Sequence, residues 1–284
     1  MRLATVRTAT GTAAVRIDEE VAVEVGPSDL VELLGDPQWR QRAARATGTE
    51  HALGSLDYAP LVGRPDKVVC VGLNYRQHIL EMGRELPDHP TLFAKYRGAL
   101  IGAHDDIVLP AVSPAMDFEA ELGVVIGQRL RYGDPAGAAA AIAGWTVVND
   151  VTARDWQNRT AQWLQGKTFE ATTPVGPWLE VAEPPASGAA SSVVPSWPLS
   201  CTVNGEPMQR ADTADLVFSP VDLVAYVSQV VTLEPGDLIA TGTPGGVGHA
   251  RRPPRYLADG DVVVTRIDGV GELRNTCRAE ALAT

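Results

Sequence analysis

Three acidic residues give the strongest chemical signal in the sequence: Asp117, Glu119 and Glu121 alternate along the segment DFEAELGVVIG. Residues two apart on a strand point to the same face of a sheet, so these carboxylates would lie side by side. The segment runs into apolar residues, which indicates that this face is partly buried. Buried, clustered carboxylates repel one another and lose hydration, and a divalent cation with oxygen ligands relieves both costs.

Asp150 is the natural third ligand beside Glu119 and Glu121, because it ends another apolar stretch, residues 145–148. Hard oxygen ligands of this kind suit Mg²⁺, Mn²⁺ or Ca²⁺. The same pattern is equally typical of an amphipathic edge strand with a solvated acidic face. The acidic residues by themselves therefore leave both a metal site and a solvated strand open.

Two further groups have chemistry suited to an active site. His78 and Glu81 are three residues apart, so on a helix they face the same way, and the carboxylate would orient the imidazole as a general base. Lys167 follows Gly166 in a mostly uncharged stretch, where its ammonium group could polarise a carbonyl or hold a carboxylate. The structural alternatives are a surface helical pair for the first group and a surface lysine at a turn for the second.

Other motifs argue against several classes of site. The segment GKT at 166–168 lacks the first glycine of a phosphate-binding loop, because residue 161 is alanine. The glycine-rich segment TGTPGGVG at 241–248 offers backbone N–H groups for an anion nest, but it lacks the GxGxxG spacing of a dinucleotide site. The absence of HExxH and GxSxG motifs, and of a cysteine in a nucleophile context, disfavours covalent serine or cysteine catalysis.

The composition of the 284 residues limits the partners of the protein. With 24 basic and 35 acidic residues the net charge is −11, which argues against a nucleic-acid partner and against an anionic membrane surface. A small anionic substrate is still allowed, since a few local cations can bind it. Three separated cysteines without a CxxC pair, and an N-terminal segment without an apolar signal sequence, predict a reduced, cytoplasmic protein.

The elements that must position these groups are mostly short strands. Apolar runs and alternation predict strands at 67–71, 107–109, 118–126, 145–148, 199–203, 238–240, 262–267 and 271–278. Helical patterns are fewer, and we expect them at 75–82, 135–143, 150–158 and 220–230. This balance favours an α+β or mostly β fold over a doubly wound sheet. An Ala-, Ser- and Pro-rich stretch at 182–198 is typical of a surface loop.

A linker divides the chain near residue 64, because residues 58–65 contain two prolines and a glycine. We expect residues 1–64 to form a small N-terminal α/β domain, with a hairpin within 1–25 and short helices at 30–34 and 38–45. Residues 65–284 would then form the catalytic domain.

Taken together, these motifs resemble the fumarylacetoacetate hydrolase (FAH) family over residues 67–278, about three quarters of the chain. The resemblance includes VGLNY at 71–75 followed by His78 and Glu81, DFEAELG at 117–123, NDVTARD at 149–155 and GKTF at 166–169. It continues with VNGE at 203–206, LEPGD at 233–237 and TGTPGGVG at 241–248. Each motif is weak alone, but their order and spacing are highly specific, and they favour the metal site over the solvated strand.

The resemblance implies an FAH-type mixed β-sandwich roll of the α+β class, β-rich, with a small N-terminal domain and in a homodimer. It implies Mg²⁺ or Mn²⁺, with Ca²⁺ as an alternative in a crystal, on Glu119, Glu121 and Asp150. His78 and Glu81 would be a water-activating dyad on a mobile lid. Four further residues match the positions that contact the oxo-acid end of the substrate: Lys167, Arg154, Gln157 and Thr243.

The short spacing of His78 and Glu81 resembles the acylpyruvase and oxaloacetate decarboxylase branch of the family. Ala171 stands where the larger tyrosine-catabolic members have threonine, which argues against fumarylacetoacetate itself as substrate. We therefore predict a Mg- or Mn-dependent hydrolase that cleaves a C–C bond in 2,4-dioxo acids, such as acylpyruvates or fumarylpyruvate, to give pyruvate and a carboxylic acid.

The same site could instead decarboxylate oxaloacetate, or isomerise a 2-hydroxy-dienoate or a keto–enol pair, and the sequence does not choose among these reactions. A bulkier β-diketone in a biosynthetic setting is a further alternative. The non-enzyme alternative is a metal-stabilised binding protein. The intact dyad, the lysine and the three carboxylates argue against it, since a protein without the chemistry has no need of all six residues.

Overall fold

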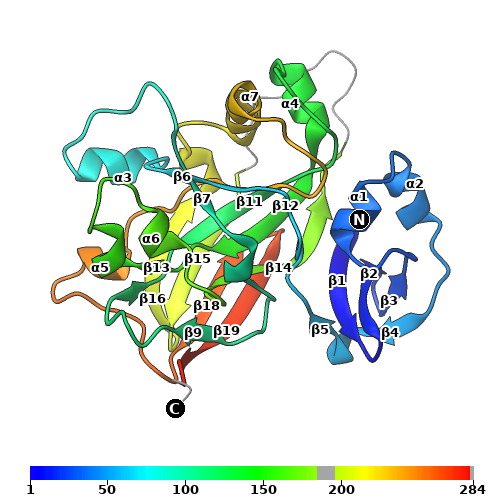
Figure 1. The fold of residues 1–284 in the computed structure, drawn as a ribbon, viewed down its shortest axis with the longest axis horizontal. Coiled ribbons are helices and arrows are strands. Elements are labelled where there is room, and N and C mark those ends of the chain that lie inside the picture. Colours follow the sequence, from blue (N-terminus) through cyan, green and yellow to red (C-terminus); the bar gives the residue numbers. More distant parts are fainter. Residues whose placement is uncertain (184–195, 282–284) are drawn as a thin grey trace.

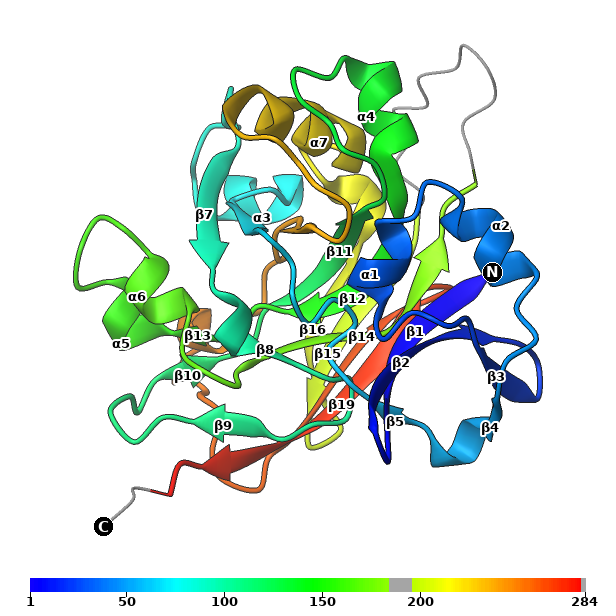
Figure 2. The ribbon, with the colours of Figure 1, turned by 45° about the vertical axis from the view of Figure 1, so that its right-hand side comes forward.

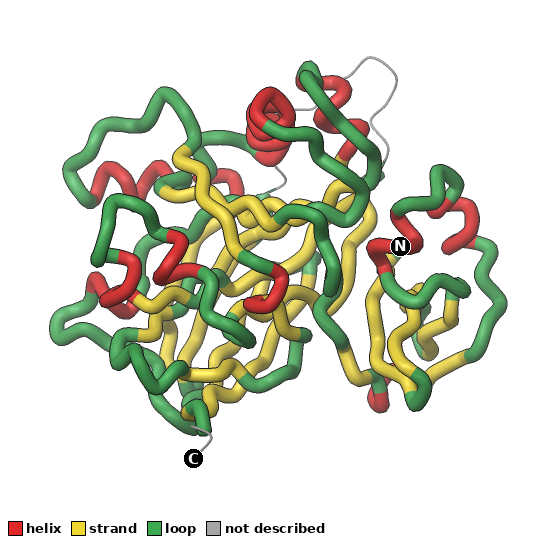
Figure 3. The backbone as a smooth tube through the Cα atoms, in the orientation of Figure 1, coloured by secondary structure: helices red, strands yellow, loops and turns green. Residues whose placement is uncertain are grey.

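The structure is a computed structural model that describes residues 1–183 and 196–281. Strands dominate it and the helices are short, as Figure 3 shows. Most of the stretch at 182–198, predicted as a surface loop, lies outside the described residues. Among the residues described, no helix has both the length and the apolar character needed to cross a membrane.

The chain begins with a small antiparallel group of strands, on the right of Figure 1. β1 (Arg2–Thr8), β2 (Gly11–Ile17) and β3 (Val21–Glu24) pair in succession, and β4 (Glu50–Ala52) pairs with β3. The 3₁₀ turn η1 (Leu53–Ser55) leads to β5 (Asp57–Tyr58), which returns to β1. α1 (Leu30–Leu34) begins where the Asp29 carboxylate accepts a hydrogen bond from the Glu32 N–H, and α2 (Trp39–Ala44) follows it.

The N-terminal strands are continuous with the main sheet. β1 pairs with β14 (Thr173–Val181), so one sheet of twelve strands runs from β4 to β7. Figure 2 shows β1 and β14 side by side where the two parts join. The division into residues 1–64 and 65–284 stays a prediction, and the backbone pairing means that a sheet crosses the predicted boundary.

The centre of the main sheet consists of apolar strands that are buried on both faces. Its order is β4-β3-β2-β1-β14-β12-β11-β17-β6-β7, and two short strands, β5 and β8, pair off this path. The strands after β14 are β12 (Ile142–Asn149), β11 (Ala120–Ile126), β17 (Leu238–Ala240), β6 (Val68–Gly72) and the edge strand β7 (Thr91–Lys95). Every residue of β11 is buried.

A second sheet of five strands packs against the first. Its order is β16 (Glu206–Asp212), β15 (Pro198–Val203), β18 (Val262–Ile267), β19 (Gly271–Ala279) and β9 (Ile107–Leu109). Asn204 and Gly205 have φ angles of 53° and 79°, which a type I′ hairpin turn needs between β15 and β16. Leu122 of the first sheet and Leu273 of the second belong to one buried cluster, so the two sheets share a core.

The helices lie outside the sheets. α4 (Pro135–Ala141) and α7 (Pro220–Val230) bury apolar residues against β11 and β17 at the top of Figure 1. α3 (Arg76–Glu81), α5 (Arg154–Gln157) and α6 (Leu164–Lys167) lie on the left of that view. The remaining short elements are η2 (Arg97–Ala99), β8 (Leu100–Ile101), β10 (Met116–Asp117), β13 (Thr152–Ala153), η3 (Thr213–Asp215) and η4 (Gly248–Ala250).

The structure confirms most predicted elements within a few residues, but two predictions near the acidic residues were wrong. The strand predicted at 118–126 begins only at Ala120, and the helix predicted at 150–158 is reduced to α5, because residues 152–153 form strand β13. The reason is one interruption in one ladder: Ala120 pairs with Asn149 and Asp117 pairs with Thr152, so residues 118–119 and 150–151 leave the regular pairing together.

Candidate active site

Glu119, Glu121 and Asp150 come together where this ladder is interrupted. The N–H of Asp150 donates a hydrogen bond of 2.8 Å to the carbonyl oxygen of Glu119, which ties the two irregular segments together. One carboxylate oxygen from each of the three residues lies within 4.8 Å of the others, and all three side chains are buried. The solvated acidic strand is therefore wrong, because all three side chains are at most 5% exposed.

Two buried lysines neutralise part of this charge. Lys167 Nζ lies 2.5 Å from Glu119 Oε2 and 2.8 Å from Asp150 Oδ2, and Lys95 Nζ lies 2.5 Å from Asp150 Oδ1. Burial alone would raise the pKa of Asp150, but the two ammonium groups outweigh it and lower the pKa to about 2. Burial also opposes the charge on Lys167, and the carboxylates of Asp150 and Glu119 outweigh that effect and raise its pKa.

A close contact between two short helices places Lys167. Gly166 precedes it in α6, and a Cβ atom at Gly166 would lie 2.5 Å from Gln157 N and 2.6 Å from Ala153 O. A residue with a side chain would push α6 away from α5 and carry Lys167 with it. Lys167 is 2% exposed, which excludes the alternative of a surface lysine at a turn.

Glu121 makes no ion pair with any described residue. Its Oε2 accepts a hydrogen bond of 2.8 Å from the N–H of Gly242, so the glycine-rich segment binds a carboxylate of its own chain. Gly242 has a φ of +103°, a conformation that side chains rarely adopt. Burial, followed by repulsion from Asp150 and Glu119, raises the pKa of Glu121 well above its ordinary value.

The donor set fits a divalent cation. The buried cluster holds four carboxylates and three cationic side chains: Asp117, Glu119, Glu121 and Asp150 against Lys95, Arg154 and Lys167. When all four carboxylates are ionised, as ligands of a cation are, one negative charge is uncompensated. Three oxygen donors with surplus negative charge are what hard cations prefer in proteins.

Arg154 connects this cluster to a neighbouring loop. Its Nε donates to Asp117 Oδ2 at 2.8 Å, and its Nη1 lies 2.6 Å from Glu119 Oε1. Asp117 also accepts hydrogen bonds from the N–H groups of Gly248 at 2.7 Å and His249 at 3.0 Å. The alternation predicted that Asp117 would lie beside Glu119 and Glu121. Asp117 is not in the group of three close carboxylates, and its side chain binds Arg154 and this loop.

One nitrogen of Arg154, Nη2, is buried and has no hydrogen-bond partner among the described residues. A buried donor without an acceptor is costly, so this nitrogen is suited to bind an oxygen of a ligand. Burial opposes the charge on Arg154, but the nearby carboxylates of Glu119 and Asp117 raise its pKa. The guanidinium therefore stays charged.

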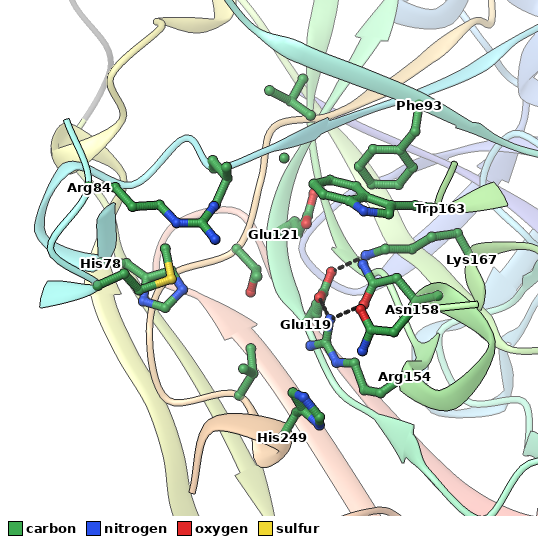
Figure 4. A pocket seen from close by; sticks show the side chains of 17 residues that line it. His78, Arg84, Phe93, Glu119, Glu121, Arg154, Asn158, Trp163, Lys167 and His249 are labelled. Carbon is green, nitrogen blue, oxygen red and sulfur yellow. Dashed lines mark hydrogen bonds and ion pairs between the residues drawn. The ribbon is translucent and has the colours of Figure 1, made fainter. Parts of the chain in front are cut away.

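A cavity of about 290 Å³ lies beside these groups, as Figure 4 shows. Its charged wall includes Glu119, Glu121, Arg154 and Lys167, and Phe93 and Trp163 provide apolar surface. Asp150 is completely buried and is not part of the wall. A molecule in the cavity would therefore meet two of the three carboxylates. It would also meet the two cationic side chains beside them, which come from α5 and α6.

His78 lies in the same wall, half-buried, and its α3 helix carries it across from the carboxylates (Figure 4). Burial lowers the pKa of His78, and the charges of Glu81 and Glu119 offset this only in part. Glu81 does not line this cavity, but it lines a neighbouring one together with Tyr75 and His78, so His78 faces both cavities. No hydrogen bond joins the described side chains of His78 and Glu81, although both lie close to Gly245. A Cβ atom at Gly245 would be 3.1 Å from His78 Nδ1 and 3.4 Å from Glu81 Oε2.

The last two predicted residues also line the cavity. Gln157 Oε1 accepts a hydrogen bond of 3.0 Å from Arg154 Nη1, which orients the guanidinium. Thr243 Oγ1 donates to the carbonyl of Ala120 at 3.0 Å and accepts from Gln209 Nε2 at 2.8 Å. The Thr243 hydroxyl is therefore satisfied within the fold, and its direct contribution is to the shape of the wall.

Sequence reasoning missed Lys95 and Arg84. Lys95 ends the segment TLFAK, and a lysine that closes a largely apolar strand is the only signal that could have marked it. Arg84 follows α3 in a polar stretch and carries no such signal. Only the fold shows their importance: it brings Lys95 to Asp150 and Arg84 to the cavity.

Comparison with known proteins is consistent with this site. Residues 67–278 match the family described as fumarylacetoacetate (FAA) hydrolase, C-terminal. The mitochondrial oxaloacetate tautomerase FAHD2A of Bos taurus is 45% identical over 216 residues, covering 75% of this chain and 67% of that protein. Its human counterpart is 44% identical over 216 residues, with the same shares of the two chains.

Solved structures match over 99% of this chain and 100% of theirs. A 5-carboxymethyl-2-hydroxymuconate delta-isomerase from Mycobacterium smegmatis has a TM-score of 0.81 at 32% identity. A fumarylacetoacetate hydrolase from Exiguobacterium antarcticum has a TM-score of 0.84 at 30% identity. The predicted α+β fold of this family is therefore confirmed. On the match that spans most of its length, this chain belongs to the fumarylacetoacetate hydrolase family.

Proposed function

We propose that this protein is an oxo-acid tautomerase, which interconverts the keto and enol forms of oxaloacetate or a closely related 2-oxo diacid. The observation that carries this proposal is the composition of the cavity wall. His78, a proton carrier, lines it together with the cations Lys167 and Arg154, while Glu81 lies outside it, in a neighbouring cavity that His78 also lines. Relatives named as oxaloacetate tautomerases and a structural relative named as an isomerase support the same class of reaction.

Glu119, Glu121 and Asp150 would hold the divalent cation, with Mg²⁺ or Mn²⁺ preferred by their oxygen ligands. When bound, this cation would supply Lewis-acid polarisation of the 2-oxo group. Two cationic side chains of the protein would also act on the oxo-acid end of the substrate. Lys167 places its charge beside Glu119, and the unpartnered Nη2 of Arg154 supplies a donor for a carboxylate or oxo oxygen.

The reaction moves one proton between carbon 3 and the 2-oxo oxygen. Because burial lowers its pKa, His78 is neutral at physiological pH and can accept the proton from carbon 3. The C–H electron pair becomes the C2=C3 double bond, and the oxo group becomes an enolate oxygen next to Lys167 and Arg154. Water protonates this oxygen to give the enol, and the imidazolium returns its proton to water, so no atom is gained or lost.

Hydrolysis of acylpyruvates, the main prediction from the sequence, is the second candidate. It is favoured by the charge of Glu81, which opposes the fall in the pKa of His78 and therefore lies near it. Hydrolysis needs a water molecule activated by the joined dyad, whereas tautomerisation needs a single proton carrier. Decarboxylation of oxaloacetate would generate an enolate in the same place and requires no base.

The test compares three reactions on one preparation that has been stripped with EDTA and reloaded with Mn²⁺. Loss of the ultraviolet absorbance of enol oxaloacetate reports tautomerisation, and coupled pyruvate release reports acylpyruvate hydrolysis and oxaloacetate decarboxylation. We expect ketonisation to be the fastest and His78→Ala to lower it by about 10²- to 10⁴-fold. Faster pyruvate release from an acylpyruvate, with the same dependence on His78, would make hydrolysis the function.

Three expectations from the sequence stay predictions beside this proposal. They are the homodimer, the cytoplasmic location, and an oxo acid in preference to nucleic acid or membrane as partner. The bovine and human relatives are named as mitochondrial, which is a property of those proteins. Size-exclusion chromatography with light scattering tests the first expectation directly.

A further inference from the structure

Arg84 is the one cationic side chain in the cavity wall that has no ionic partner among the described residues. It follows α3, and Figure 4 shows its guanidinium directed toward the interior of the cavity, between His78 and Glu121. Only its backbone N–H makes a hydrogen bond, 3.2 Å long, to the carbonyl of Ile79. Its guanidinium makes neither an ion pair nor a hydrogen bond with any described residue.

The other two cations of the wall are used within the fold. Lys167 bridges Glu119 and Asp150, and Arg154 binds Asp117 and Glu119. Their charges offset buried carboxylates and lie at the inner end of the cavity. With a divalent cation on the carboxylates, this inner end would carry one surplus positive charge, which suits the single carboxylate of the oxo-acid end. A second carboxylate would need a cation elsewhere.

Arg84 supplies such a cation on the opposite side of the cavity. Its charge is among the influences that lower the pKa of His78, so the guanidinium is near the imidazole in space as well as in sequence. In Figure 4 the two side chains lie together on the α3 side, across from Glu119, Lys167 and Arg154. A molecule held at the inner end by its oxo-acid group therefore extends past His78 toward Arg84.

We propose that Arg84 binds the distal carboxylate of a 2-oxo dicarboxylic acid and selects diacids over monoacids. This inference rests on the proposed function, and it specifies the substrate class. A guanidinium presents paired donors that match a carboxylate, and such charge-assisted hydrogen bonds are stronger than neutral ones. Arg84 would then be a specificity residue, while the proton transfer is assigned to His78.

The first test compares a diacid with a substrate of the same backbone that lacks the distal charge: oxaloacetate and its 4-methyl ester. Enol–keto conversion is measured at about pH 8, where histidine side chains are neutral. For Arg84→Ala we expect the ratio of kcat/KM for the diacid to that for the ester to fall by about tenfold to a hundredfold, mainly through KM. Arg84→Lys should recover part of this ratio.

Arg76→Ala is the matched control. Arg76 is the first residue of α3, the helix that precedes Arg84, and it is exposed and not part of the cavity wall. Its replacement therefore makes the same change of net charge outside the cavity. We expect its diacid-to-ester ratio to equal that of the wild type. If the diacid-to-ester ratio fell as far in Arg76→Ala as in Arg84→Ala, the proposal would be overturned. The ratio would then depend on the net charge of the protein and not on a contact between Arg84 and the substrate.

A binding measurement separates this inference from the proposed reaction. The stable pair is 2-oxoglutarate and 2-oxopentanoate, which differ only in the distal carboxylate, titrated calorimetrically into the Mn²⁺-loaded protein. Wild type should prefer the diacid and Arg84→Ala should lose that preference, even if no tautomerisation is detected. An unchanged preference in Arg84→Ala, or no preference in wild type, would reject the assignment of Arg84 whatever the reaction proves to be.

Discussion

Lys95 and Asp150 form an ion pair inside the protein: Lys95 Nζ lies 2.5 Å from Asp150 Oδ1, and the two side chains are 1% and 0% exposed. Lys95 also donates a hydrogen bond of 3.1 Å to the carbonyl of Val151. β7 thereby fastens the irregular segment that carries Asp150, although β7 is at the far edge of the sheet from β12. The carboxylate cluster therefore depends on a strand that supplies none of its acidic residues.

Lys95→Met should destabilise the protein by about 3–5 kcal/mol, because it leaves a buried carboxylate with one partner fewer. Chemical denaturation in metal-free buffer measures this free energy of unfolding. Arg266→Ala, which removes a surface partner of Asp268, is the control and should cost far less. If the Lys95 variant were as stable as this control, Lys167 alone would be enough to compensate the buried charge of Asp150.

Glu121→Gln should affect stability and metal binding in opposite directions. Without metal, Glu121 is a buried acid whose pKa is raised by burial and by Asp150 and Glu119, so a neutral amide of the same shape relieves repulsion. We expect a metal-free melting temperature at or above that of the wild type. The added stability from Mn²⁺ should shrink, because affinity falls by at least about tenfold.

Thermal unfolding with and without Mn²⁺ checks both parts of this prediction, and calorimetry gives the affinity. Glu180→Gln, at a carboxylate that pairs with Arg2 near the surface, is a control outside the cluster. Metal affinity that survives in Glu121→Gln would remove Glu121 from the ligand set. A strong loss of metal-free stability would contradict the repulsion inferred for this cluster.

Local patterns in the sequence were enough to predict most of the strands, but by themselves they left the acidic residues open between a metal site and a solvated strand. The order and spacing of the motifs that resemble the family favoured the metal site, and the structure brings Glu119, Glu121 and Asp150 together. The sequence could not show that the ladder breaks at 118–119. Asp117, next to this break, binds Arg154, Gly248 and His249, which are distant in sequence.

Residues that act through long-range contacts were harder to predict for the same physical reason. Lys95 is 55 residues from Asp150, and no spacing rule connects them. Gly166 looked like part of a failed phosphate-binding motif, whereas its role is to let α6 pack on α5. Arg84 has no local pattern at all. Composition likewise reported only a net charge of −11 and hid the cations gathered around the cavity.

The activity should stay high as the pH falls below 6.5, the ordinary pKa of histidine, because burial lowers the pKa of His78. The neutral imidazole is the base, so the acidic limb of the kcat/KM profile should begin only when the pH passes through this lowered value. In Arg84→Lys, which keeps the charge, the limb should stay in place. In Arg84→Ala it should move to higher pH, because one of the charges that lower the pKa is lost.

The same shift has a consequence for stability. The folded protein binds a proton at His78 less readily than the unfolded chain, so His78 contributes stability that is present above about pH 6.5 and is lost as the pH falls through the folded pKa. In His78→Asn, the free energy of unfolding should change less with pH in this range. Denaturation curves between neutral and mildly acidic pH measure it, and an identical slope in the variant would mean that His78 has the same pKa folded and unfolded.

Glu81→Gln separates the two candidate reactions. Glu81 does not line the cavity and makes no hydrogen bond to His78 among the described contacts, so tautomerisation, which needs only His78, should fall by less than about tenfold. Hydrolysis of an acylpyruvate depends on a joined dyad and should fall by about 10²-fold or more. Both rates are measured on the same Mn²⁺-loaded sample, with His78→Ala as the variant expected to lose both. Equal, large losses in Glu81→Gln would mean that the two side chains join when substrate binds, which would favour hydrolysis as the function.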